Sequence, residues 1–146
     1  MIPEILATLA CGIFAGAAIY VSAVEQPVRL SCGTALAIAE WRPSYQRGTV
    51  MQASLALTGS VLAFFSAWLS RDPAWIVGGA LLFAVIPFTF LVIFPTNKKL
   101  QSAELDVTSA EAERLLRLWG RLHAVRGVLS LLAFAVFLYA LQSKGR

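Results

Sequence analysis

Residues 73–97 read PAWIVGGALLFAVIPFTFLVIFPTN and contain no charged side chain. At a rise of about 1.5 Å per residue, a helix of this length crosses the hydrocarbon core of a bilayer, which is roughly 30 Å thick. The chain contains three more uncharged runs: residues 5–24, 48–70 and the shorter 127–143. The sequence therefore predicts four membrane-spanning helices, over approximately residues 4–25, 46–70, 73–95 and 118–142.

The composition of the chain also favours a lipid environment. Of its 146 residues, 58% are hydrophobic and 14% are charged, whereas soluble domains carry roughly 45–50% apolar and about 25% charged residues. A closed barrel would need alternating strands, so the predicted fold is all-α, a single-domain antiparallel four-helix bundle. In a membrane protein, a net charge of +4 reflects basic residues in the loops that flank the membrane, so no nucleic-acid partner is expected.

Two connections between the predicted spans are longer than a turn. Residues 30–41 are largely apolar, which predicts a short interfacial helix with Trp41 at headgroup depth, or a segment folded into the mouth of the bundle. Residues 98–118 form the most polar stretch, and Thr108-Ser-Ala-Glu111 within it is typical of a capping box. The last helix is therefore expected to begin in water near Ser109, as a cytoplasmic extension of the final span.

The first predicted span carries a signal for close helix packing. Gly12 and Gly16 form a G-x-x-x-G pair, which allows a neighbouring backbone to approach closely. The sequence leaves two partners open, namely another helix of the same chain or a second subunit in a homo-oligomer.

The last predicted span has two opposite polar faces. At 100° per residue, one face collects three arginines: Arg114, Arg117 and Arg121. This face suits solvent and lipid phosphates. Trp119, His123 and Arg126 share the other face, and Arg126 lies deepest. An unpaired cation at that depth costs several kcal/mol unless it meets a polar partner or a water-filled cavity. We therefore expect the second face to point into the bundle.

Other spans supply candidate partners for this face. A second helix that begins at Pro43 carries Tyr45 and Gln52 seven residues apart on one stripe, with Arg47 at its mouth. In the third span, Pro87 removes a helical hydrogen bond, and Thr89 and Asn97 follow it. A kink beside polar groups can shape a cavity. Alternatively, such prolines and threonines only satisfy their own backbones.

Common cofactor and enzyme signatures are missing from the sequence. His123 is the only histidine, so two histidines of one chain cannot hold a haem. Cys11 and Cys32 lack the C-x-x-C spacing of zinc sites. The chain also has no G-x-S-x-G, P-loop or dinucleotide-binding pattern. The sequence therefore predicts neither a metal nor an organic cofactor.

Three motifs together carry a resemblance to a known family. They are Tyr45-Gln-Arg-Gly48, Ile86-Pro-Phe-Thr-Phe-Leu-Val-Ile-Phe-Pro-Thr-Asn97 and Leu118-Trp-Gly-Arg-Leu-His-Ala-Val-Arg126. In order and spacing, the chain resembles the anthrone oxygenase-like family of small four-helix membrane proteins over nearly its whole length. The resemblance implies an oxygenase that converts a lipophilic anthrone-type phenol to an anthraquinone with O2, without a metal or flavin.

The resemblance also implies roles for individual residues. An anthrone reacts with oxygen once it is deprotonated to an electron-rich enolate, so a base, an oxyanion donor and an apolar slot are needed. His123 is the candidate base, and Arg126 and Asn97 are the candidate donors to the enolate or peroxide oxygen. The candidates for substrate binding are Trp119, Tyr45, Arg47, Gln52 and Thr89.

The main alternative is a non-catalytic membrane protein. The same polar mouth would then bind a quinone, a lipid or a small lipophilic compound, or hold a partner subunit. Transport is a third alternative, which four short helices would achieve only as an oligomer.

The distribution of basic residues predicts the orientation in the membrane. They concentrate in the first and third connections: Arg29, Arg42, Arg47, Lys98, Lys99, Arg114, Arg117 and Arg121. The opposite side carries Arg71, Lys144 and Arg146. By the positive-inside rule, the longer connections and the candidate site face the cytoplasm of a multi-pass protein, expected in a bacterial inner membrane.

Overall fold

A computed structural model of the protein describes residues 1–143. Lys144 and Arg146, which entered the expected charge asymmetry, lie outside the described residues. The helical elements follow one another as α1 (Ile2–Tyr20), the π-helical turn η1 (Val21–Glu25), α2 (Gln26–Ser31), α3 (Thr34–Ser70), α4 (Pro73–Phe88), the π-helical turn η2 (Thr89–Ile93), α5 (Phe94–Gln101) and α6 (Ala110–Ser143).

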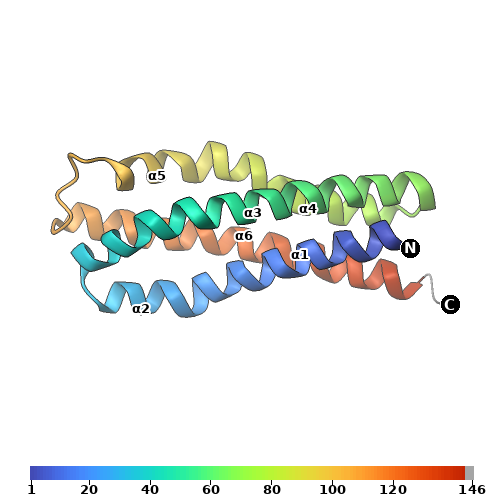
Figure 1. Ribbon diagram of the computed structural model, residues 1–146, viewed down its shortest axis with the longest axis horizontal. Coiled ribbons are helices and arrows are strands. Elements are labelled where there is room, and N and C mark those ends of the chain that lie inside the picture. The colour runs from blue at the N-terminus through green and yellow to red at the C-terminus, as the bar shows by residue number, and fades with distance from the viewer. Residues whose placement is uncertain (144–146) are drawn as a thin grey trace.

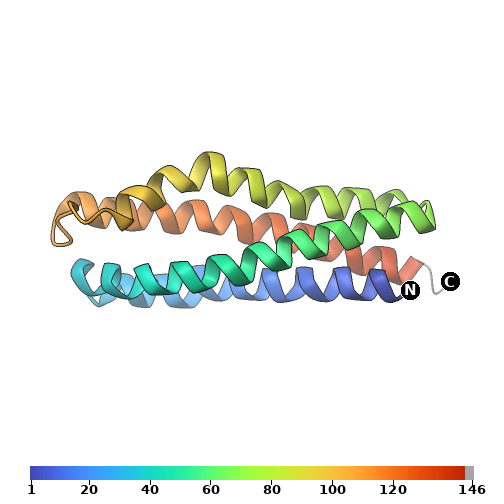
Figure 2. The ribbon, with the colours of Figure 1, turned by 45° about the horizontal axis from the view of Figure 1, so that its top comes forward.

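These elements join into four long rods, over residues 2–31, 34–70, 73–101 and 110–143. By length and composition, each rod is able to cross a membrane. Successive rods run in opposite directions, so that α1 begins and α6 ends at the same end of the molecule (Figure 1). α1 packs against α3 and α6, and α4 packs against the same two helices. The predicted all-helical fold with four spanning helices is confirmed, and Figure 2 shows the same arrangement from a second side.

The prediction of a separate interfacial helix between the first two spans is wrong. The first rod continues to Ser31, Gly33 makes the turn with a positive φ of 87°, and α3 begins at Thr34. Pro43, which would suit a helix start, instead lies inside α3. The helix extends beyond it towards the N-terminus because Trp41 packs into the core with none of its surface exposed.

Arg42 further fixes this N-terminal part of α3. Its Nε and Nη2 donate hydrogen bonds to the carbonyls of Leu100 and Ser102, at 3.1 and 2.9 Å. These carbonyls lie at the C-terminus of α5, where a cation is favoured by the helix dipole. The burial of Trp41 thus matches the alternative expectation for residues 30–41, a segment within the mouth of the bundle.

The cap of α6 lies one residue later than the capping-box prediction. The Ser109 hydroxyl accepts the backbone N–H of Ala112 at 3.1 Å, and α6 begins at Ala110. The Thr108 hydroxyl instead donates to Asp106 at 2.7 Å. The capping-box prediction was wrong because the Thr108 hydroxyl donates to the Asp106 carboxylate within an Asx-type turn and so does not cap α6.

Glycines and small residues bring the rods together at the end near the N-terminus. A Cβ added at Gly12 would lie 2.9 Å from the ring of Phe134, whereas one at Gly16 would meet nothing within 4 Å. Of the predicted pair, Gly12 therefore makes room for α6 of the same chain, while Gly16 faces open space.

Both π-helical turns end two residues before a proline. Val21–Glu25 precedes Pro27, and Thr89–Ile93 precedes Pro95. A proline ring clashes with the carbonyl four residues earlier, and a wide turn displaces that carbonyl. Such turns rotate the following side chains and are frequent at functional sites. The sequence predicted a kink at Pro87 in the third rod, whereas the turn that lines a cavity is η1 in the first rod.

Candidate functional site

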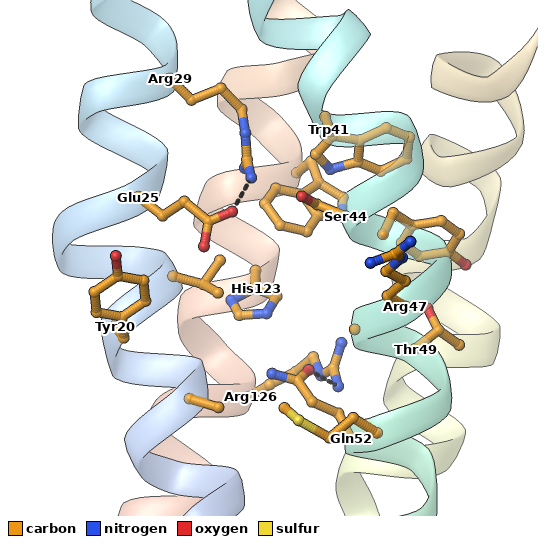
Figure 3. Close-up of a pocket in the computed structure, with 16 residues that line it drawn as sticks. Tyr20, Glu25, Arg29, Trp41, Ser44, Arg47, Thr49, Gln52, His123 and Arg126 are labelled. Carbon is orange, nitrogen blue, oxygen red and sulfur yellow. Dashed lines mark hydrogen bonds and ion pairs between the residues drawn. The ribbon is translucent and has the colours of Figure 1, made fainter.

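A cavity of about 330 Å³ lies between the first rod and α3, with α6 at its back (Figure 3). Its walls comprise Ala17, Tyr20, Val21, Glu25, Arg29, Trp41, Ser44, Tyr45, Arg47, Gly48, Thr49, Met51, Gln52, Trp119, His123 and Arg126. This volume is at the lower end of the range of roughly 300–1,000 Å³ that small-molecule sites occupy. The cavity is therefore large enough for a small flat ligand.

The two faces of α6 are arranged as the helical periodicity predicts. Trp119 and His123 are buried, Arg126 is partly buried, and all three line the cavity. The three arginines of the other face are all exposed: Arg114, Arg117 and Arg121. The polar groups of the interior face thus meet a hollow space rather than acyl chains.

Aromatic rings form one continuous wall of the cavity. Tyr45 stacks on Trp41 with a centroid distance of 4.9 Å and an interplanar angle of 11°. Trp41 meets Trp119 edge to face at 5.6 Å, and Trp119 lies 4.8 Å from the His123 ring. Such a wall offers flat faces to a flat ligand while it holds the imidazole in place.

A hydroxyl of the first rod contacts the imidazole. Ser22 Oγ, in η1, lies 3.2 Å from His123 Nδ1. When Nδ1 carries the proton and donates it to Ser22, Nε2 keeps its lone pair. The π-helical turn therefore supplies the group that can select the basic tautomer of His123.

Arg126 is a cation without an anionic partner. Its Nη2 donates a hydrogen bond of 2.8 Å to Gln52 Oε1, and the guanidinium carbon lies 5.4 Å from the centroid of the Phe14 ring. Its Nε is buried without a hydrogen-bond partner. Among residues 1–143, the ion pairs do not include Arg126. The cavity thus holds an uncompensated positive charge, which favours an anionic or electron-rich oxygen.

A second arginine closes the cavity at the end of the molecule that carries the α2–α3 and α5–α6 connections, here called the loop end. Arg29 is 5% exposed and pairs with Glu25 on its own rod and with Glu40 on α3. It also donates to Gln26 Oε1 at 2.8 Å, and its guanidinium carbon lies 5.8 Å from the centroid of the Trp119 ring. This ion-pair cluster joins the first rod to α3 above the cavity.

In the sequence Glu25 marked the edge of the first span, and its ion pair with Arg29 was not predicted. The spacing of Glu25 and Arg29, four residues apart on one helix, was the available signal. The pairing with Glu40 required knowledge that α3 begins before Pro43.

Six predicted site residues line the cavity: Tyr45, Arg47, Gln52, Trp119, His123 and Arg126. Asn97 and Thr89 do not. Asn97 is buried and its Nδ2 donates to Tyr45 Oη at 3.0 Å, so it contacts the aromatic wall from behind. The Thr89 hydroxyl donates to its own helix at Val85 O, at 2.7 Å. The expected direct contact of these two residues with a ligand is therefore not supported by their positions.

Acidic, thiol and imidazole groups do not cluster for a metal within the described residues. No set of three or more His, Cys, Asp or Glu side chains there could hold an ion. Cys11 and Cys32 are both free thiols, the former buried and the latter exposed. The groups that face the cavity are thus one imidazole, three guanidinium groups, one carboxylate, hydroxyls, an amide and aromatic rings.

The matched sequence region contains most of this site. The anthrone oxygenase family model matches residues 41–136, which include every predicted site residue. The chain belongs to this family of anthrone oxygenases.

Individual relatives extend the likeness along the chain. An anthrone oxygenase of Aspergillus fumigatus is 29% identical over 142 residues, covering 90% of this chain and 88% of that protein. An anthrone oxygenase of Claviceps purpurea is 30% identical over 138 residues, with 84% and 79% covered. One from Paecilomyces divaricatus is 29% identical, with 80% and 81% covered. No solved structure matches the chain.

The ion-pair cluster gives an asymmetric prediction for stability. The double variant Glu25→Gln, Glu40→Gln leaves Arg29 as a buried unpaired cation and should lower the free energy of unfolding by about 3–5 kcal/mol. Arg29→Gln should cost less, because the carboxylates it leaves behind are 28% and 44% exposed. Reversible unfolding in detergent, with helicity measured by circular dichroism, compares the two. An equal or larger cost for Arg29→Gln would contradict the assignment.

Proposed function

We propose that this chain is a membrane oxygenase that oxidises a flat, lipophilic anthrone-type phenol with O2 in the cavity between the first rod, α3 and α6. One observation carries the proposal. An imidazole and an unpaired guanidinium face the same aromatic-walled space inside a helix arrangement built for lipid. Family membership supports the same chemistry, because the curated relatives are anthrone oxygenases.

His123 acts as the base in this proposal. Its Nε2 removes a proton from the methylene carbon of the anthrone, while its Nδ1–H donates a hydrogen bond to Ser22 Oγ. Imidazole suits the task because its ordinary pKa is near neutrality. The product of this step is an electron-rich enolate inside the cavity.

Arg126 stabilises the enolate oxygen. Its guanidinium lies three residues from His123 on α6, and none of the ion pairs within residues 1–143 includes it. Gln52 accepts from Nη2 and so fixes the orientation of the planar group. A preorganised cation in an apolar surrounding is worth far more to a developing oxyanion than the same cation in water.

The oxygen step then needs no further reductant. The enolate transfers an electron to O2, and the two radicals combine to form a carbon–oxygen bond at the former methylene carbon. The peroxide takes up the proton held by His123. Loss of the second hydrogen of that carbon as a proton breaks the O–O bond, and the departing hydroxide becomes water. The balance is anthrone plus O2 giving anthraquinone plus water.

Trp119 and Tyr45 bound the slot in which the rings lie. Their faces belong to the aromatic wall that runs from Tyr45 through Trp41 to His123. Asn97 has a different role from the one the sequence suggested, since it holds the Tyr45 hydroxyl and so positions the wall. Arg47 lies exposed at the rim of the cavity.

Replacement of the two charged site residues tests the chemistry. With purified protein and anthrone, His123→Ala should lower kcat for O2-dependent anthraquinone formation by roughly 10²–10⁴-fold through loss of the base. Arg126→Met should lower it by about 10²–10³-fold through loss of the oxyanion donor. Absorbance of the product and oxygen consumption are measured together.

Arg121→Met on the exposed face of α6 is the matched control and should retain wild-type turnover. Unchanged turnover in both site variants would remove the proposed mechanism. Anthrone binding without any turnover by the wild type would favour the non-catalytic alternative.

The orientation of the site is a separate part of the proposal. The basic residues that flank the loop end of the molecule support a cytoplasmic location for this end and the cavity. In a Cys11→Ala variant produced in a bacterial host, the exposed Cys32 at this end should react with a membrane-impermeant maleimide only in inside-out vesicles. Reaction in right-side-out vesicles would reverse the assignment. The curated relatives are fungal, so the bacterial inner membrane rests on the expectation alone.

A further inference from the structure

The walls of the cavity differ in how far they are exposed. Trp119 and His123 at the back and Trp41 and Arg29 at the loop end are all at most 6% exposed. The exposed lining residues lie on the facing edges of two rods. They are Tyr20 on α1, which is 58% exposed, Met51 on α3, which is 46% exposed, and Arg47 and Thr49 beside it. The cavity therefore opens sideways, between α1 and α3.

The side opening is visible in the close-up of the site. Tyr20 stands on one edge and Thr49 on the other, with His123 and Arg126 behind the gap between them (Figure 3). The opening has two ends. Towards the loops, the Arg29–Glu40 ion pair joins the rods. Towards the N-terminus, they meet at Gly59, where an added Cβ would lie 3.4 Å from Ala10 Cβ.

Exposed apolar side chains flank the side opening on both rods, and Arg47 is the charged exception on its α3 edge. Val24 on the first rod is 47% exposed and Val50 on α3 is 73% exposed. Tyr20 lies more than one helical turn from Glu25 on the side away from the loops, which is roughly 7 Å deeper along the helix. Large apolar side chains that are exposed at this depth are typical of contact with acyl chains.

A hollow on the outer face continues the opening. Its volume is about 420 Å³, and it shares Tyr20, Glu25 and Arg29 with the cavity. Its other walls are mostly apolar and include Val28 and Leu36, which are 59% and 60% exposed. A lipophilic molecule at the surface of the first rod would thus lie next to the opening, with only the Arg29 cluster between the two spaces.

Gly48 widens the opening on the α3 side. A Cβ added there would meet nothing within 4 Å, although the residue lines the cavity. Gly16 on α1 likewise has open space around it but does not line the cavity. The two glycines therefore make a matched pair, one inside the opening and one on the outer surface of the helices.

We propose that the substrate reaches the site from within the bilayer, through the side opening between Tyr20 and Met51, and not from the aqueous phase. The identity of that substrate rests on the proposed function, whereas the opening itself does not. The route selects flat compounds that partition into membranes, since the rings can pass edgewise while an alkyl substituent stays in the lipid. At the loop end, the buried side chains of Arg29 and Trp41 separate the cavity from the water beyond the helix ends.

Cysteine labelling in lipid vesicles tests the route without any need for turnover. In a Cys11→Ala, Cys32→Ser background, Gly48→Cys places a thiol in the cavity and Gly16→Cys places one on the outer surface. Each variant is exposed to an N-alkyl maleimide dissolved in the lipid and to a polymer-linked maleimide confined to water. Native Cys32 in the Cys11→Ala chain is the control for the water-confined reagent. Elution as a single species in detergent checks that each variant folds.

The side opening predicts a specific pattern of adducts. Gly48→Cys should react with the lipid-dissolved reagent within about threefold of the Gly16→Cys rate, and at least about tenfold faster than with the water-confined one, because thiol reaction follows access. Faster reaction with the water-confined reagent overturns the proposal. So does reaction with neither reagent while Gly16→Cys is labelled. Since the readout is a thiol adduct, failure of anthrone oxidation would leave this result standing.

Discussion

The site depends on one constraint, the placement of the Arg126 cation inside a helix arrangement made for lipid. A guanidinium at this depth is costly unless it faces polar groups or a cavity. Here the guanidinium donates to the amide oxygen of Gln52 and lies over the ring of Phe14. Within residues 1–143, no carboxylate forms an ion pair with it. The same helical turn carries His123. A base and an unneutralised cation therefore share one small space, which is the requirement for making and holding an enolate.

The first rod completes this site from outside the region that matches the family. Residues 41–136 supply the imidazole, the guanidinium and the aromatic wall. The π-helical turn before Pro27 adds Ser22 against His123, and the next turn adds Arg29, whose ion pairs join the first rod to α3. The cavity lies between this ion-pair cluster and the close contact at Gly59, and both rods line it. The ion-pair cluster and the side opening both follow from the course of the first rod beside α3.

Charge and periodicity were sufficient to predict four long apolar helices and the interior face of α6. They succeed because the free energy of placing an unpaired charge in lipid is larger than the local propensity of any residue for a helix or a turn. Local signals failed where tertiary packing decided the outcome. Pro43 resembled a helix start until the burial of Trp41 extended α3, and Thr89 resembled a ligand contact although its hydroxyl satisfies Val85 O. Asn97 is near the site but behind Tyr45, and the partner of Arg29 on another helix has no signature in a single sequence.

The most direct test of the account is the formation of the anthrone anion in the absence of oxygen. Anthrone and its enolate differ in visible absorption, so anaerobic mixing with the protein at neutral pH separates deprotonation from the oxygen step. The account predicts the spectrum of a bound enolate with the wild type and with Arg121→Met, and its loss with Arg126→Met. An enolate signal of wild-type size in Arg126→Met, or none in a wild type that still oxidises anthrone in air, would contradict it.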